Sequence, residues 1–307
     1  MRPAVSWPAG PVTVTVPATS ANLGPGFDAM GLALSMHDVV QARVQAAGLS
    51  IEVTGHGEQT AADGEDHLVV RAMQACFAEL GGQPPGLAIS CRNRIPQGFG
   101  LGSSAAAIVA GVLAASALAG GAGHPAPLDL ATRLEGHPDN VAACLAGGLT
   151  IAWQGDAGPG AVRLAPLAAL TPVLCVPPAP VATQAARQAL PATVPHSDAA
   201  ANAARAALLV AALTADPDLL LPATEDFLHQ RYRAAAMPDT FALMQRLRAA
   251  GIPAVVSGAG PAVLALCVEG SAPGAAEVTD LTGQAAGSWQ VLPLAVDHAG
   301  ASVTFPG

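Results

Sequence analysis

Two patterns of hydrophobic and polar residues recur along the chain, and each predicts a different element. Residues 12–16, VTVTV, alternate valine with threonine, as in a strand with one buried face. Residues 66–80, DHLVVRAMQACFAEL, carry apolar side chains at helical spacing before Gly81-Gly82, so a helix is expected to end there. Residues 254–268, AVVSGAGPAVLALCV, predict two apolar strands around a glycine turn. The chain is therefore expected to contain both strands and helices.

A predicted strand, a glycine-rich turn and a predicted helix follow one another between residues 87 and 119. The turn carries glycine at alternate positions: Gly98, Gly100 and Gly102. Glycine permits backbone conformations and close approach that suit a loop around a bulky anion. Ser103 and Ser104 stand where the helix is expected to begin, and the unpaired amides of a helix N-terminus attract phosphate. The alternative is a glycine turn that only caps a buried helix.

A dense polar cluster lies farther along, in the segment LEGHPDNVAA. A helix is expected to end near Glu135 and Gly136, and Pro138 suits the first turn of the next one. An acid, an imidazole, a second acid and an amide fall within six residues: Glu135, His137, Asp139 and Asn140. Packing alone does not explain this density, although Asp139 and Asn140 would also suit a helix start. The cluster is a candidate for chemistry beside the glycine loop.

Two other regions contribute weaker candidates. Asn22 and Asp28 lie in the turn-rich segment NLGPGFD, for which ordinary turn chemistry is the favoured interpretation when it is read alone. Arg187 precedes a loop broken by proline, and solvation on a helix face is its default interpretation. Residues 154–172 are rich in glycine, proline and alanine without clear periodicity, so they are the best candidate domain boundary.

Composition narrows the class of protein. The chain of 307 residues has a formal charge of −9 and an estimated pI of about 5.2, which argues against a nucleic-acid surface. It contains 13 arginines and no lysine, which excludes the phosphate loop GxxxxGK[ST]. The apolar run 105–119 is shorter than the ~20 residues that span a bilayer. The proline-containing N-terminus lacks the apolar core of a signal peptide, and the five cysteines are scattered among apolar residues. We expect a cytoplasmic protein with reduced thiols and no membrane partner.

Three ordered stretches together resemble one superfamily. VPATSANLGPGFDAMGLAL, then GLGSSAAA with EGHPDNVAA, and finally SGAGPAVLAL are similar to the signature motifs of the GHMP small-molecule kinases, and most similar to those of the homoserine kinase family. The resemblance runs from about Val12 to Val268. It implies an α+β, two-domain GHMP kinase fold, with a ribosomal-protein-like N-terminal domain containing a left-handed crossover and a ferredoxin-like C-terminal domain. We assign residues 1–160 to the first domain, 161–307 to the second, and the active site to the cleft between them.

The resemblance also implies roles for individual residues. The loop that wraps the ATP phosphates is expected to comprise Pro96, Gly98, Gly100, Leu101, Gly102, Ser103 and Ser104. Ser104 and Glu135 match the hydroxyl and the carboxylate that hold Mg²⁺. The pocket for the amino-acid substrate L-homoserine is expected to comprise Asn22, Asp28, His137, Asp139, Asn140, Arg187, Arg233, Gly258 and Gly260. Within it Asp28 would bind the ammonium group, and Arg187 with Arg233 the carboxylate, while Arg231 leaves open which arginine of HQRYR does so.

The implied reaction is transfer of the ATP γ-phosphoryl group to the side-chain hydroxyl of L-homoserine, in threonine biosynthesis. Relatives such as mevalonate kinase place an aspartate near the hydroxyl, whereas the matching position here is Asn140. We therefore expect Asn22, Asn140, Glu135 and Ser104 to act by positioning and charge stabilisation. The alternatives are a kinase for a mevalonate-type or sugar substrate, and a sensor on the same fold that binds ligands without catalysis. The family also implies a homodimer.

Overall fold

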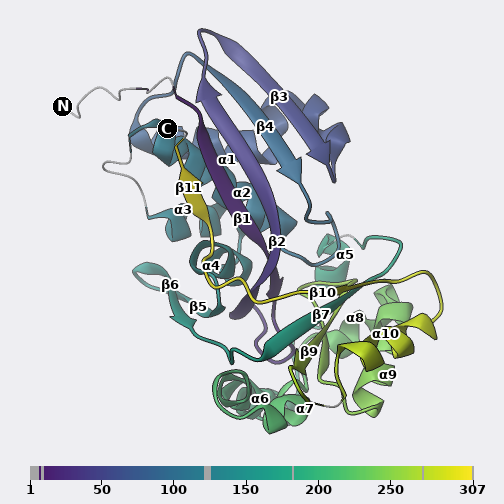
Figure 1. Cartoon of the computed structure of the whole chain (residues 1–307). Helices are drawn as coiled ribbons and strands as arrows, with labels where there is room; N and C mark the ends of the chain where they lie inside the picture. Colours follow the sequence, from purple (N-terminus) through teal and green to yellow (C-terminus); the bar gives the residue numbers. More distant parts are fainter. Residues whose placement is uncertain (1–6, 8–9, 121–125, 182, 272, 306–307) are drawn as a thin grey trace.

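The computed structural model describes residue 7 and residues 10–120, 126–181, 183–271 and 273–305, and it folds around two β-sheets (Figure 1). The large sheet has seven strands, and the path β11-β1-β2-β4-β3 is extended by β5, which pairs with both β2 and β6. Its strands are β1 (Val12–Ala21), β2 (Met30–Val44), β3 (Gly48–Gly55), β4 (Gly86–Asn93), β5 (Leu149–Gly155), β6 (Gly158–Leu164) and β11 (Ser302–Thr304). Strand β3 is parallel to β4, and α1 connects them.

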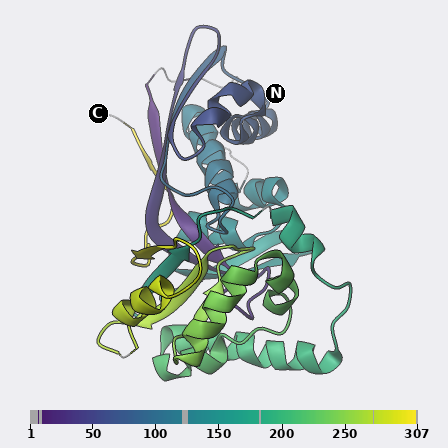
Figure 2. The same cartoon turned by 90° about the vertical axis from the view of Figure 1, so that its right-hand side faces the viewer.

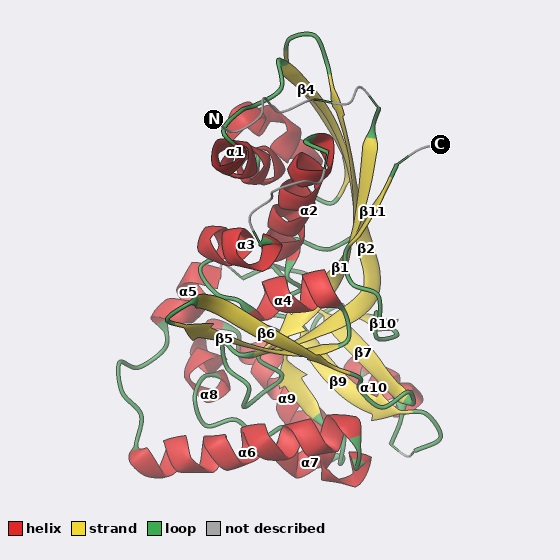
Figure 3. Cartoon of the chain, turned by 90° about the vertical axis from the view of Figure 1, so that its left-hand side faces the viewer, coloured by secondary structure: helices red, strands yellow, loops and turns green. Residues whose placement is uncertain are grey.

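Alternation of residue type explains why the large sheet is covered on one face. Val12, Val14 and Val16 of β1 are buried, whereas Thr13 and Thr15 between them lie half-buried on the opposite face. The covering helices lie on one side of the sheet (Figures 2 and 3). They are α1 (Leu68–Leu80), α2 (Ser103–Leu118), α3 (Pro127–Glu135) and α4 (Asp139–Ala146). The predicted helix at 66–80 and the strand at 12–16 are thus confirmed.

Helix α2 is buried around almost its whole circumference, which accounts for its long apolar run. Gly111 lets it approach α1 closely, because a Cβ atom there would lie 2.5 Å from the carbonyl oxygen of Val69. No helix within the described ranges is long and apolar enough to cross a membrane. All five cysteines are free and buried, as expected.

The small sheet has the strand order β10-β7-β9-β8. Its strands are β7 (Leu170–Val176), β8 (Ala254–Val256), β9 (Val263–Val268) and β10 (Gln290–Pro293). Helices α9 (Pro238–Ala249) and α10 (Ala275–Gly283) pack on it. The same half of the chain also forms α5 (Thr183–Gln188), α6 (His196–Thr214), α7 (Leu220–Ala223) and α8 (Gln230–Arg233). The strand–helix–strand–strand–helix–strand order and this pairing give the ferredoxin-like arrangement that was expected.

Both faces of the small sheet are buried, which explains its continuous apolar strands. Val173, Cys175 and Val263 pack with α9 and α10 in one core, whereas Leu174 and Leu264 face the other way, into the core of the large-sheet half. The two halves therefore share a hydrophobic interface.

The predicted boundary at residue 160 falls inside β6, which pairs with β5 in the large sheet. The chain also returns to that sheet at its end, because β11 pairs with β1. The division into domains stays a prediction, and sheet membership favours a boundary after Leu164.

Candidate active site

The glycine-rich loop is held by its carbonyl groups. Gly98, Gly100 and Gly102 have φ angles of 79°, 76° and 66°, so every second residue is left-handed. Four successive carbonyls, those of residues 98–101, accept hydrogen bonds from outside the loop. The donors are Val181 N (3.2 Å), Ala262 N (3.2 Å), Ser257 Oγ (2.7 Å) and Thr19 N (3.0 Å), in that order. With the carbonyls bound to the protein, the loop amides and the N-terminus of α2 are left to face an anion.

Two of these glycines are also required by space. A Cβ atom on Gly100 would lie 2.1 Å from the carbonyl oxygen of Ser257, in the turn between β8 and β9. A Cβ atom on Gly102 would lie 1.9 Å from Thr19 Oγ1. The loop is therefore clamped between β1 and the second glycine turn, which belong to different halves of the molecule.

Ser104 and Glu135 form a hydroxyl–carboxylate pair beside the loop. Ser104 is the second residue of α2, and Glu135 is the last residue of α3. Ser104 Oγ donates a hydrogen bond to Glu135 Oε2 over 2.7 Å. Burial raises the pKa of Glu135, a cost that a bound cation would offset. Two oxygen ligands next to a phosphate site fit Mg²⁺, which usually takes few protein ligands and completes its shell with phosphate and water.

The residues after Glu135 are connected by hydrogen bonds at the start of α4. His137 Nδ1 lies 2.6 Å from Asp139 Oδ1, which also accepts from the Asn140 amide (2.8 Å). Burial disfavours the imidazolium form, but the hydrogen bond and the charges of Asp139 and Glu135 outweigh it and raise the pKa of His137. Thr19 Oγ1 donates to Asn140 Oδ1 over 2.8 Å, so the Asn140 NH₂ group is the part left for a ligand.

The turn between β1 and β2 brings an acid to the opposite wall. Asn22, Leu23 and Asp28 have positive φ angles of 69°, 49° and 52°. The Asn22 side chain holds this conformation, because its Nδ2 donates to the Gly258 carbonyl (2.8 Å) and its Oδ1 accepts from the Asp28 amide (2.9 Å). Asp28 forms an ion pair with Arg187 of α5, with 3.0 Å between Oδ1 and Nη2.

The two arginines of HQRYR have different surroundings. Arg233 is 1% exposed, yet it lines the cavity, and its Nη1 donates to the Gly258 carbonyl over 3.1 Å. Burial lowers its pKa to about 10, so it stays charged at neutral pH. Arg231 points away and pairs with Asp198 and Tyr232 at the surface. Of the two, the geometry therefore favours Arg233 as the substrate ligand.

One cavity collects nearly all the predicted site residues. Its lining contains Asn22, Asp28, Gly98, Gly100, Leu101, Gly102, Ser103, Ser104, Glu135, His137, Asp139, Asn140, Arg187, Arg233 and Gly258. Two predicted residues, Pro96 and Gly260, are not among those that line it. Ala21 also lines it and was missed, because an alanine carries no chemical signal in a sequence, whereas Ala259 lies in the segment 257–261 that was expected to close the site.

A second cavity shares Ser103 and Ser104 with the first and continues beyond the glycine loop. It has a volume of about 280 Å³ and polar groups that the sequence analysis did not select: Asp38, Thr60, Asp63, Asp66, His67, Asn93 and Gln97. His67 is 6% exposed, its Nδ1 has no hydrogen-bond partner in the described part of the chain, and burial lowers its pKa. In the sequence His67 falls at the start of the helix expected over residues 66–80, so nothing distinguished it.

Comparison with known proteins identifies the family. Residues 67–148 match the GHMP kinases N-terminal domain, and residues 204–278 match the GHMP kinases C-terminal domain. The chain is 56% identical to a homoserine kinase of Streptomyces avermitilis over 96% of both chains. It is 50% identical to a homoserine kinase of Leifsonia xyli, over 95% of this chain and 91% of the relative.

Solved structures support the same family. The homoserine kinase of Cytophaga hutchinsonii superposes with a TM-score of 0.81 at 29% identity, over 96% of this chain and 98% of that one. Mevalonate diphosphate decarboxylase of Staphylococcus aureus shares the fold, with a TM-score of 0.68 at 15% identity over 96% and 98% of the two chains. The two matched domains, the full-length identity and this fold together show that the chain belongs to the homoserine kinase family of the GHMP kinases.

Proposed function

We propose that the cavity phosphorylates the side-chain hydroxyl of L-homoserine with ATP, giving O-phospho-L-homoserine and ADP. The observation that carries this proposal is the juxtaposition of a phosphate loop, a hydroxyl–carboxylate pair and three charged side chains, Asp28, Arg187 and Arg233, in one cavity. The loop and the hydroxyl–carboxylate pair suit ATP with its metal ion, and the three charged side chains suit a zwitterion. The family assignment supports the same reaction.

ATP extends across both cavities in this proposal. Its phosphates bind the amides of residues 98–104, and its nucleoside occupies the second cavity, where His67 Nδ1 offers an unused hydrogen-bonding atom. Ser104 and Glu135 would hold Mg²⁺, which would neutralise phosphate charge when bound. Ser103 and Ser104 line both cavities, so a nucleotide in the second cavity would have its phosphates beside the cavity that contains Asn140 and the charged side chains.

When L-homoserine binds, the ion pair between Asp28 and Arg187 is replaced by contacts of each side chain with the substrate. Both side chains are more than a third exposed, at 37% and 39%, so the pair is accessible to a ligand. The substrate ammonium takes Asp28, and the carboxylate takes Arg187 and Arg233, whose planar guanidinium groups suit a carboxylate. A simple hydroxy acid would take Arg187 from Asp28 without supplying a cation in return, and a neutral sugar could replace neither partner of the ion pair, which disfavours those substrates.

Catalysis then relies on orientation and charge rather than on a strong base. The Asn140 NH₂ group can donate but cannot accept a proton, and Asp139 Oδ1 is already bonded to His137 and to the Asn140 amide. Phosphoryl transfer tolerates this arrangement, because its loose transition state requires positioning and neutralisation of charge more than covalent chemistry.

A coupled ADP-release assay with Mg²⁺-ATP tests the proposal. Turnover is expected with L-homoserine and not with mevalonate, galactose or L-serine. Turnover with mevalonate or galactose would contradict the zwitterion pocket, and ATP binding without turnover on any acceptor would favour a sensor. Sedimentation of the same sample tests the homodimer, which remains a prediction.

Replacement of Asp28 by asparagine is expected to raise the KM for L-homoserine by about 10–100-fold, the cost of losing a hydrogen bond to a charged group. The KM for ATP should not change, because Asp28 does not line the nucleotide cavity. Steady-state kinetics with each substrate varied in turn measures both values. Asp198→Asn, which removes the surface partner of Arg231, is the matched control and should leave both KM values unchanged. An Asp28→Asn enzyme with an unaltered KM for homoserine would contradict the assigned role.

Replacement of Asp139 by asparagine is expected to lower kcat by less than about tenfold, because Asp139 positions His137 and does not remove the substrate proton. Single-turnover rates with both substrates saturating measure the chemical step separately from binding. A loss of about 10²–10⁴-fold with binding intact is the effect of a missing general base and would refute the proposed mechanism.

A further inference from the structure

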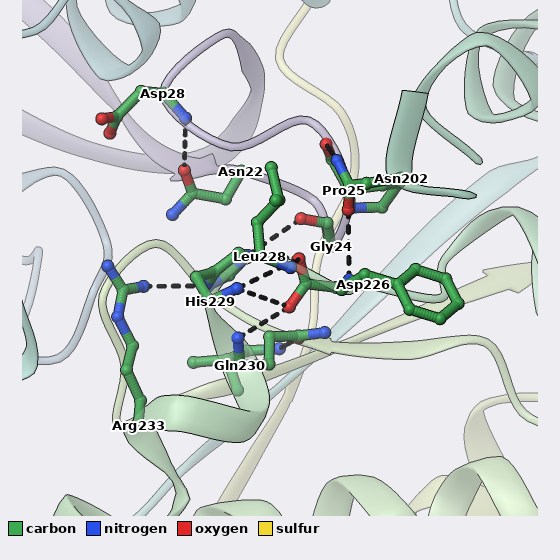
Figure 4. A network of polar contacts seen from close by, with 12 residues as sticks. Asn22, Gly24, Pro25, Asp28, Asn202, Asp226, Leu228, His229, Gln230 and Arg233 are labelled. Atoms are coloured by element: carbon green, nitrogen blue, oxygen red, sulfur yellow. Dashed lines mark hydrogen bonds and ion pairs between the residues drawn. The ribbon is translucent and has the colours of Figure 1, made fainter. Parts of the chain in front are cut away.

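His229 lies behind the amino-acid pocket, outside the lining of either cavity, and it is fully buried at 0% exposure. Both of its ring nitrogens are bonded (Figure 4). Nδ1 lies 3.0 Å from Arg233 Nη1, and Nε2 lies 2.9 Å from the carbonyl oxygen of Gly24. The ring also stacks on Phe27, with 5.2 Å between the ring centroids. A single side chain thus contacts both Arg233, which lines the pocket, and the turn that carries Asn22 and Asp28.

The partners determine the tautomer of this histidine. A guanidinium group can only donate, so Nδ1 must accept from Arg233, and a carbonyl can only accept, so Nε2 must carry the hydrogen. His229 is therefore neutral, and burial lowers its pKa in the same direction. Its backbone is anchored as well, because the buried Asp226 carboxylate accepts from the amides of Leu228, His229 and Gln230 at the start of α8.

The hydrogen bond from His229 Nε2 to Gly24 holds the turn that carries Asn22 and Asp28. That turn is strained, with three non-glycine residues at positive φ, so it requires contacts that hold it. His229 provides one of them at Gly24, and Asn202 provides another by donating to the Pro25 carbonyl over 2.8 Å. At the other end of the ring, Nδ1 holds Arg233. Arg233 Nη1 donates to His229 Nδ1 and to the Gly258 carbonyl, and Arg233 Nε donates to the Ala186 carbonyl.

We propose that His229 is a positioning residue that sets the spacing between the ammonium-binding turn at Asp28 and the carboxylate-binding Arg233. An α-amino acid presents its two charges at a fixed separation, so the pocket must hold its two counter-charges at a matching one. The ring of His229 is a rigid spacer with an acceptor at one end and a donor at the other, which suits this purpose. The inference rests on the proposed roles of Asp28 and Arg233 in binding homoserine.

Two conservative variants separate the two ends of the spacer. His229→Asn keeps an oxygen near the position of Nδ1 that can accept from Arg233, but it loses the donor to Gly24. His229→Gln keeps an amide nitrogen near the position of Nε2 that can donate to Gly24, but it loses the acceptor for Arg233. Each is expected to raise the KM for L-homoserine by about tenfold with little change in the KM for ATP, and His229→Leu, which loses both bonds, by about 100-fold. Calorimetric titration with homoserine should give the same order of affinities.

Thr282→Val is the matched control, since it removes a buried polar contact between α10 and Cys175 of β7, and Thr282 does not line the pocket. It should lower the melting temperature without altering either KM. If the Asn and Gln variants lower stability as Thr282→Val does and leave the homoserine KM unchanged, His229 is merely structural and the inference is overturned. Asp28→Asn, measured in parallel, distinguishes failure of the proposed pocket from failure of the role of His229. An unchanged KM for homoserine in Asp28→Asn would refute the pocket itself. A raised KM for homoserine in Asp28→Asn, with unchanged values in the His229 variants, would refute only the positioning role of His229.

Discussion

Glutamine in place of Glu135 is expected to lower kcat by about 10²–10³-fold, the effect of removing one preorganised electrostatic partner from a transition state. The substitution keeps the size of the side chain and a hydrogen-bonding oxygen for Ser104, so the wall of the cavity should remain intact. It removes the negative charge of the carboxylate that we propose binds Mg²⁺. The Mg²⁺ concentration for half-maximal turnover should therefore rise together with the loss of kcat, which a metal titration at saturating ATP and homoserine measures.

Two controls accompany that experiment. Glu52→Gln removes a carboxylate from exposed strand β3 and should alter neither kcat nor the Mg²⁺ titration. Ser104→Ala removes the hydroxyl of the proposed metal pair and should shift the titration in the same direction as Glu135→Gln. If Glu135→Gln lost kcat with an unchanged Mg²⁺ requirement, Glu135 would act on the substrate and the metal assignment would be wrong.

Alanine in place of Gly100 is expected to reduce kcat/KM by at least about 10²-fold, since displacement of a bound reactant by about 1 Å has an effect of this size. The added Cβ atom would lie 2.1 Å from the Ser257 carbonyl and 2.9 Å from backbone atoms of Gly260, and backbone cannot rotate away as a side chain can. The phosphate loop and the β8–β9 turn must therefore separate. The φ angle of 76° adds about 1–2 kcal/mol of strain for a residue with a Cβ atom.

Gly81→Ala distinguishes this effect from strain alone. Gly81 ends α1 with a similar φ angle of 80°, but nothing lies within 4 Å of its added Cβ. It should lose stability by about 1–2 kcal/mol, seen in urea unfolding, and retain full kcat/KM. Equal kinetic losses in both variants would mean that the loop does not depend on its contact with Ser257.

Short-range features of the fold were predictable from the sequence. The strand at Val12, the helix that ends before Gly81, the glycine turn at Ser257 and the start of α2 at Ser103 each depend on a few neighbouring residues. The phosphate loop belongs to the same class, because alternate glycines describe a backbone conformation that is largely local. The two-domain fold was predictable in a different way, from a resemblance carried by three motifs together.

The position of the domain boundary shows where local reasoning stops. Residues 154–172 look like a linker because they lack periodicity, yet β6 lies within them and pairs with β5. Strand β11 joins β1 from the far end of the chain. Both pairings are long-range or hairpin contacts whose register depends on the partner strand, so composition alone does not reveal them.

Arg231 and Arg233 illustrate the same limit at the level of side chains. Residues two positions apart on a helix point in different directions, so only one of them can face the pocket. The sequence predicted that an arginine of this segment, Asp28 and a hydroxyl–carboxylate pair belong to the site. Only the tertiary structure decided that Arg233 faces inward, that His67 lines the second cavity, and that His229 connects Arg233 with the turn at Gly24, because each depends on packing between segments distant in the chain.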